Sequence, residues 1–116
     1  MLLLPWNNRS GHWALLCLDW PAQTARYFDS LDSDQPSELP SVCKMFFGDT
    51  WTGAVQTVRS PQQDDAHSCG AYMLLNAWYV ARARPLPPTY PRGALLRDRL
   101  ARAWLHNALP SHFDGR

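Results

Sequence analysis

The sequence has few cysteines and no closely spaced pair of them. Its 116 residues include three cysteines, and no two form a CxxC motif. This pattern argues against a disulfide framework and against a tetrahedral zinc site, so we expect no metal and an intracellular protein, in the nucleus or the cytoplasm. A zinc site would have to combine side chains whose spacings match no usual ligand pattern. These are Cys17, Cys43, His67 and Cys69.

Long apolar runs and an excess of one charge are also missing. The opening MLLLPW is too short for a signal peptide, and no run approaches the roughly 18 apolar residues of a membrane helix. The 11 basic and 10 acidic residues give a net charge of +1, which is too balanced for a phosphate-binding surface. The late arginines alternate with Leu and Ala at helical spacing, which indicates a solvated helix face. We therefore expect neither a membrane nor a nucleic acid as partner.

The remaining composition is that of one small folded domain. Hydrophobic residues make up 46% of the chain, and six residues are tryptophans, so one modest core is possible. No internal repeat and no domain boundary divide the sequence, so residues 1–116 are predicted to form a single domain. A Met followed by three leucines and a proline resembles the middle of a strand, and we therefore expect a truncated chain.

Apolar spacing predicts strands first and helices afterwards. Residues 12–20 and 24–31 are predicted to form a hairpin, and residues 53–60 alternate as a third strand. The polar stretch 32–41 is predicted to be a loop. A last helix is predicted over residues 93–109. Its expected core-facing residues are Leu95, Leu96, Leu100, Ala103 and Trp104.

A helix is also predicted to begin at Cys69, which would place this thiol in the first turn. Asp64, Asp65 and Ser68 precede it as possible caps. The helix dipole favours a thiolate at such a position, and the thiolate is the reactive form of cysteine. Gly70 leaves room beside the sulfur for backbone or substrate. The alternative is that Cys69 is a small core residue packed under the helix.

A nucleophilic thiol needs a base, and the predicted hairpin supplies a candidate. His12 begins the first strand and Asp29 ends the second, so an antiparallel pair would bring them to one rim of the sheet, where Asp29 could orient the imidazole. Gln63, with Gln62 beside it, could stabilise an oxyanion together with the backbone N–H of Cys69. The alternatives are a strand-end histidine, a turn carboxylate and a polar loop glutamine, none with a catalytic role.

Three stretches in this order resemble the ubiquitin-like-protein-specific cysteine proteases, also called SUMO or sentrin-specific proteases: GHWALLCLDW, RYFDSL and PQQDDAHSCGAYML. In that family a His-Trp pair opens a strand, an Asp follows in a Tyr-Asp-Ser turn, and a Gln lies six residues before the cysteine. The resemblance implies that His12 is the general base and acid, Asp29 its orienting partner, Gln63 the oxyanion donor and Cys69 the nucleophile.

The resemblance also implies an α+β, papain-like cysteine protease core, in which a small antiparallel or mixed sheet packs with helices. The implied activity is cleavage after the C-terminal Gly-Gly of SUMO or a related modifier, in maturation or deconjugation. Trp13 would line a narrow slot for glycine beside Gly70. The thiolate would form a thioester that water hydrolyses, without a metal or organic cofactor. The implied partners are SUMO or another ubiquitin-like protein and its conjugates, and the protein is expected to be a monomer.

Two features depart from the family pattern. Family domains carry an N-terminal portion ahead of the His-Trp strand, including a second tryptophan over the slot, and we expect this portion to be missing here. Trp6 is too close to His12 to be that tryptophan. Ser68 stands where many members have Asp. Two alternatives to the active protease therefore stay open: an inactive remnant that at most binds a ubiquitin-like protein, and a viral-type processing cysteine protease of the same architecture.

Overall fold

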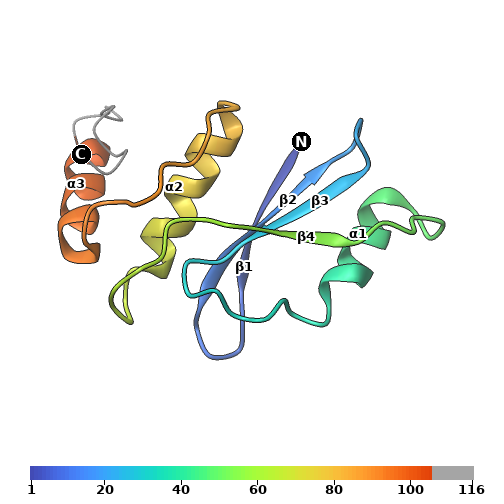
Figure 1. Cartoon of the computed structure of the whole chain (residues 1–116), viewed down its shortest axis with the longest axis horizontal. Coiled ribbons are helices and arrows are strands. Elements are labelled where there is room, and N and C mark those ends of the chain that lie inside the picture. Colours follow the sequence, from blue (N-terminus) through green and yellow to red (C-terminus); the bar gives the residue numbers. More distant parts are fainter. Residues whose placement is uncertain (106–116) are drawn as a thin grey trace.

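The computed structural model describes residues 1–105 of the chain, and a four-stranded sheet forms its centre (Figure 1). The strands β1 (Leu2–Asn7), β2 (Trp13–Asp19) and β3 (Thr24–Phe28) pair antiparallel, and β4 (Val55–Val58) joins β3 in parallel. The sheet is therefore mixed, and the α+β prediction is confirmed.

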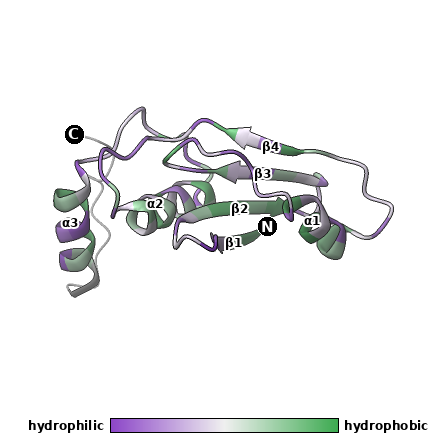
Figure 2. Cartoon of the chain, turned by 90° about the horizontal axis from the view of Figure 1, so that it is seen from below, coloured by the Kyte–Doolittle hydropathy of each residue, from purple (hydrophilic) through white to green (hydrophobic). Residues whose placement is uncertain are grey.

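Strand β2 is buried on both faces because helices cover the sheet from two sides. Alternate residues of a strand point to opposite faces. One set of β2 side chains packs against α1 (Leu39–Phe47), and the other packs against α2 (Cys69–Ala81). The first set is Ala14, Leu16 and Leu18, and the second set is Leu15 and Cys17. Figure 2 shows the hydrophobic colouring of β2 between these helices.

Helix α1 was not predicted, because the polar stretch before it resembles a loop throughout. The loop prediction over residues 32–41 is correct only as far as Glu38, since α1 begins at Leu39. Pro40 lies in the first turn, where the missing backbone N–H costs no hydrogen bond. Three apolar side chains four residues apart are buried, and these anchor α1 on the sheet: Leu39, Cys43 and Phe47.

Helix α3 (Gly93–Leu105) packs on the side of α2 that faces away from the sheet. Leu96, Leu100 and Ala103 follow the helical period and contact the α2 cluster, as expected. Leu95 was expected in the core but is exposed, because it lies one residue away from that stripe. The predictions for residues 106–109 and for the Trp104 side chain fall outside the described part. No helix within residues 1–105 is long and apolar enough to cross a membrane.

Two adjacent leucines of α2 allow a matched test of this packing. Leu75 is 1% exposed between α2 and α3, whereas Leu74 is 57% exposed. We expect Leu75→Ala to lower the free energy of unfolding by about 2–5 kcal/mol because it leaves a cavity. Leu74→Ala should change it by less than about 0.5 kcal/mol. Urea denaturation measures both values, and equal losses would contradict this packing.

Candidate active site

His12 and Asp29 meet at one rim of the sheet, where β2 begins and β3 ends. His12 Nε2 lies 2.6 Å from Asp29 Oδ1, and the two side chains are 10% and 2% exposed. Asp29 Oδ1 also accepts a hydrogen bond from the Leu31 N–H, at 2.9 Å. The hairpin thus brings together the two residues that the sequence placed at its ends, and among the described residues the imidazole is hydrogen-bonded through Nε2 alone.

The turn between β1 and β2 fixes the backbone of His12. Asn8 Oδ1 accepts a hydrogen bond from the His12 N–H, and the Asn8 N–H donates to the His12 carbonyl, both at 3.0 Å. Gly11 has φ +85°, a conformation that suits glycine and completes this turn. The His12 backbone, from which the imidazole extends, is therefore held at both its N–H and its carbonyl.

Asp29 lies in a buried environment that also affects Tyr27. Burial, together with the negative charge of Asp29 and a hydrogen bond to it, raises the pKa of Tyr27 to about 12. The Asp29 carbonyl accepts hydrogen bonds from Gln62 Nε2 at 3.0 Å and from Ser60 Oγ at 3.4 Å. Gln62 Nε2 donates also to the Ser60 carbonyl, at 3.1 Å, so this glutamine is used in holding the Asp29 turn.

Gln63 is oriented differently from its neighbour. Its N–H donates to the Ser30 carbonyl at 2.9 Å, and its side-chain Oε1 accepts a hydrogen bond from Ser30 Oγ. Its Nε2 donates to the Asp65 carbonyl at 2.8 Å. A side-chain amide carries two N–H donors, and within residues 1–105 only this one acceptor is used. One N–H of Gln63 thus stays available, as an oxyanion donor requires.

Ser30 is a residue of this site to which the sequence analysis gave no role. It follows Asp29 directly and is buried, and its hydroxyl donates to Gln63 Oε1, which orients the amide so that Nε2 reaches the Asp65 carbonyl. Its place in the Tyr-Phe-Asp-Ser stretch was the available signal, because a small hydroxyl residue in a turn commonly hydrogen-bonds nearby polar groups.

Cys69 is the first residue of α2, and it differs from the other two cysteines in its surroundings. Cys17 and Cys43 are buried, and burial raises the pKa of both thiols, to about 12 for Cys17. Cys69 is half-buried and belongs to none of the core clusters formed by residues 1–105. Cys17 and Cys43 lie in cores on opposite faces of the sheet, and within the described residues no three potential metal ligands come together.

The start of β2 and the start of α2 touch each other beside this thiol. A Cβ added to Gly70 would lie 3.8 Å from Trp13 Cδ1, and Trp13 itself is partly exposed. His12 and Cys69 are the chain neighbours of these two residues. Within residues 1–105 the Cys69 thiol makes no hydrogen bond to another side chain. The imidazole and the thiol therefore come from two elements in contact, without a hydrogen bond between them.

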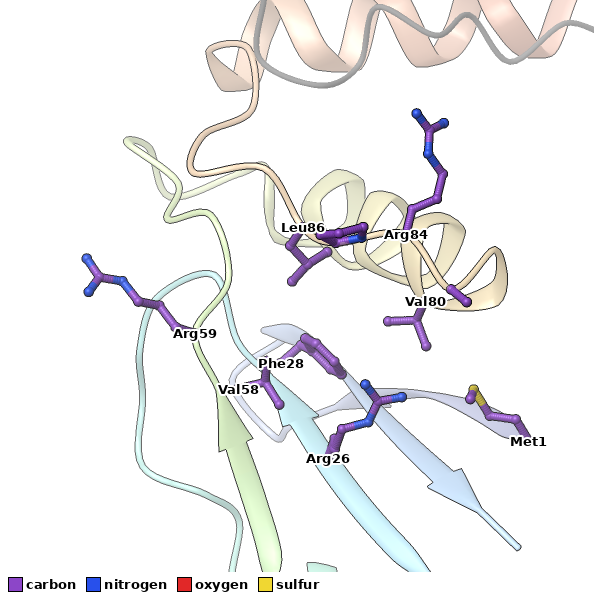
Figure 3. Close-up of a pocket in the computed structure, with 10 residues that line it drawn as sticks. Met1, Arg26, Phe28, Val58, Arg59, Val80, Arg84 and Leu86 are labelled. Carbon is purple, nitrogen blue, oxygen red and sulfur yellow. The ribbon is translucent and has the colours of Figure 1, made fainter. Parts of the chain in front are cut away.

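A cavity of about 520 Å³ lies at the other end of α2 (Figure 3). Its apolar lining includes Phe28, Val58 and Val80, from the ends of β3, β4 and α2. Val80 is about 16 Å along the helix from Cys69, given a rise of about 1.5 Å per residue. The cavity is therefore separate from the group of residues around Cys69.

The chain matches one protein family over most of its length. Residues 1–103 match the Ulp1 protease family, C-terminal catalytic domain. A comparison with curated protein sequences finds no match. The family match confirms the predicted resemblance and, with the observed elements, the predicted fold class.

Several solved structures are similar to this chain. One is the SUMO protease Ulp1 with its catalytic cysteine oxidised to a sulfenic acid, with a TM-score of 0.70 and 24% identity over 90% of this chain. The yeast Ulp1 protease domain in complex with Smt3, the yeast ortholog of SUMO, has a TM-score of 0.57 and 26% identity over 72%. The Xanthomonas campestris effector XopD bound to ubiquitin has a TM-score of 0.56 and 26% identity over 87%. This chain covers 52%, 42% and 59% of those chains, respectively.

The environment of Asp29 predicts a loss of stability at high pH. Tyr27 has a pKa of about 12 in the folded chain against an ordinary value of 10.0, so between these values the unfolded chain has released a proton that the folded chain keeps. The stability that this raised pKa contributes is complete well below pH 10, and about 2 kcal/mol of it is lost as the pH rises to about 12. We expect Tyr27→Phe to weaken this decline. Urea denaturation between pH 8 and about 12 measures it, and an unchanged decline would exclude Tyr27 as a source.

Proposed function

The chain belongs to the Ulp1 protease family, and we propose that it is a cysteine peptidase and isopeptidase that cleaves after the C-terminal Gly-Gly of SUMO or a related modifier. The observation that carries this proposal is the 2.6 Å contact between His12 and Asp29, together with a half-buried Cys69 at the start of α2, where the next residue, Gly70, lies against Trp13. A base, a group that orients it and a thiol at a helix N-terminus together can perform acyl transfer.

In the proposed reaction His12 first takes the thiol proton. Asp29 occupies Nε2, so Nδ1 is the nitrogen left to receive it. The Cys69 sulfur then forms a bond with the scissile carbonyl carbon, and the carbonyl electrons move onto oxygen. When the carbonyl forms again, the bond to the leaving amine breaks and the imidazolium gives that amine a proton. Water hydrolyses the thioester by the same steps, which releases a carboxylate and restores the thiol.

Two N–H groups are suited to stabilise the intermediate oxyanion. The Cys69 N–H is among the first donors of α2, which have no acceptor within the helix. The second donor is the N–H of Gln63 that no described acceptor takes. Trp13 and Gly70 would form the slot for the glycine residues ahead of the cleaved bond. Their closeness supports this role, because a Cβ at Gly70 would already be in van der Waals contact with the indole, at 3.8 Å.

A second candidate is supported by the length of the match. The chain spans 42% to 59% of the solved chains it resembles, so about half of their length has no counterpart in it. An inactive remnant would keep the sheet and helices while Cys69 stays unreactive. A viral-type processing protease would keep a reactive Cys69 but prefer another substrate. A covalent probe distinguishes both alternatives from the proposal, because it reports whether Cys69 reacts and with which modifier.

We expect ubiquitin-like proteins that carry a C-terminal electrophile to label Cys69. The measurement is intact mass after incubation with a panel of such probes, and Cys69→Ala is the control. An adduct with one modifier supports the proposal and identifies the modifier. Labelling of Cys69 by a small alkylating agent without any such adduct would favour another substrate. If Cys69 reacts no faster than Cys17 and Cys43, the active protease is excluded for this chain.

The orienting role of Asp29 predicts a loss in kcat. Asp29→Asn should lower kcat by about 10²- to 10⁴-fold, because the amide no longer stabilises the imidazolium. Turnover of a fluorogenic ubiquitin-like substrate measures this, and His12→Ala gives the lower limit. Asp19→Asn, a change of a partly exposed carboxylate at the far end of β2, is the matched control. Equal activity of Asp29→Asn and the control would contradict the role.

The proposed role of oxyanion donor predicts different losses in kcat for substitutions of Gln63 and Gln62. Gln63→Ala should lower kcat by about 10²- to 10³-fold with little change in KM, because the interaction forms only with the developing charge. Ser30→Ala should lower kcat by about five- to tenfold, since it removes the hydrogen bond that orients the amide. Gln62→Ala is the matched comparison. If Gln62→Ala lowers kcat more than Gln63→Ala does, the oxyanion donor is Gln62, and the assignment to Gln63 is wrong.

A further inference from the structure

A chain of polar contacts ties the loop before Cys69 to α3. Asp65 Oδ1 accepts hydrogen bonds from the His67 and Ser68 N–H groups, both at 2.9 Å. Asp65 Oδ2 accepts one from Ser68 Oγ at 2.8 Å. Arg97 Nη1, on α3, donates to Ser68 Oγ at 2.9 Å and lies 3.8 Å from Asp65 Oδ2. The Ser68 hydroxyl thus joins the carboxylate of the loop to the guanidinium of the helix.

The first residue of α3 lies directly on this contact. A Cβ added to Gly93 would stand 2.0 Å from Asp65 Oδ2 and 2.1 Å from Ser68 Oγ. Such distances are far below van der Waals contact, so any larger residue would displace both side chains. Ser68 is fully buried, and a buried hydroxyl is normally hydrogen-bonded. Asp65, Ser68, Gly93 and Arg97 are called the clamp below.

The clamp does not depend on the ion pair alone. The side chains of Arg97 and Asp65 are 45% and 28% exposed, and an ion pair so accessible to water contributes little by itself. The His67 N–H first, and then the Ser68 hydroxyl and other groups, lower the pKa of the Asp65 carboxyl. The carboxylate is therefore ionised at neutral pH, and Ser68 provides the buried link to Arg97.

Asp65 contacts both sides of the proposed oxyanion site. Its carbonyl accepts the hydrogen bond from Gln63 Nε2, and its carboxylate accepts one from the N–H of Ser68, the residue directly before Cys69. We propose that Asp65, Ser68 and Arg97 are positioning residues, through which α3 holds the N–H donors of Gln63 and Cys69 in place. This inference rests on the proposed function of those two donors.

Three substitutions open the clamp in different ways. Arg97→Ala removes the guanidinium, and Ser68→Ala removes the linking hydroxyl. Gly93→Ala keeps every polar group and only displaces Asp65 and Ser68, while alanine is favoured over glycine in a helix. Arg102→Ala is the matched control, because it removes an exposed arginine of the same helix whose partner is Asp98. Circular dichroism checks that each variant folds.

The first measurement is hydrogen exchange, which does not require the chain to be enzymatically active. Amide hydrogen exchange by NMR on the whole chain should be roughly tenfold faster at His67 and Ser68 in the three clamp variants, and unchanged in Arg102→Ala. The Cys69 N–H and the Gln63 side-chain amide signals should shift in the clamp variants alone. If exchange at His67 and Ser68 stays as in the unmodified chain, or if the Gln63 and Cys69 signals do not move, the clamp is overturned.

The second measurement is the split between kcat and KM on a fluorogenic ubiquitin-like substrate. Clamp variants should lose about tenfold in kcat at unchanged KM, less than the loss of a whole oxyanion donor. Added guanidinium should restore part of the kcat of Arg97→Ala and none in Arg102→Ala. Faster exchange with an unchanged kcat would overturn the positioning role. Absence of turnover in the unmodified chain would instead count against the proposed function, while the NMR signals still decide the clamp.

Discussion

The antiparallel pairing of β2 with β3 is the constraint on which the rest of the structure depends. Leu16 lies opposite Tyr27 and Leu15 opposite Phe28, so the two strands place alternate side chains into two different cores. A slip of one residue would exchange these apolar sets between the faces. Such a slip would also separate His12 from Asp29, because these residues lie directly next to the ends of β2 and β3 and follow the same register. Burial of β2 therefore secures the register that a single hydrogen bond between the two side chains could not fix.

Helix α2 positions the Cys69 thiol relative to the sheet. One side of α2 packs on the second face of the sheet and the other side packs on α3, so the helix is held between two clusters. Its first turn remains at the edge of both clusters, where Cys69 is half-buried and Gly70 lies against Trp13. Apolar packing thus places the N-terminus of a helix, with its unpaired N–H groups, beside the rim that holds His12.

Polar contacts fix the parts that apolar packing does not reach. The loop before α2 has few apolar side chains, and its shape follows from Ser30, Asp65 and Ser68. Ser68, directly before Cys69, carries no charge of its own. The carboxylate of Asp65, three residues earlier, accepts the Ser68 hydroxyl hydrogen bond and lies 3.8 Å from Arg97. Asp65 therefore supplies a negative charge close to the start of α2.

Local patterns were enough to predict the three strands after residue 12, the helix at Cys69 and the meeting of His12 with Asp29, because alternation and a hairpin are local properties. It did not predict α1, whose helical stripe of Leu39, Cys43 and Phe47 follows a polar stretch. The choice between Gln62 and Gln63 and the contact of Arg97 with Ser68 were decided only by the tertiary structure. These depend on which groups from distant segments come within hydrogen-bond reach, and no local pattern encodes that distance.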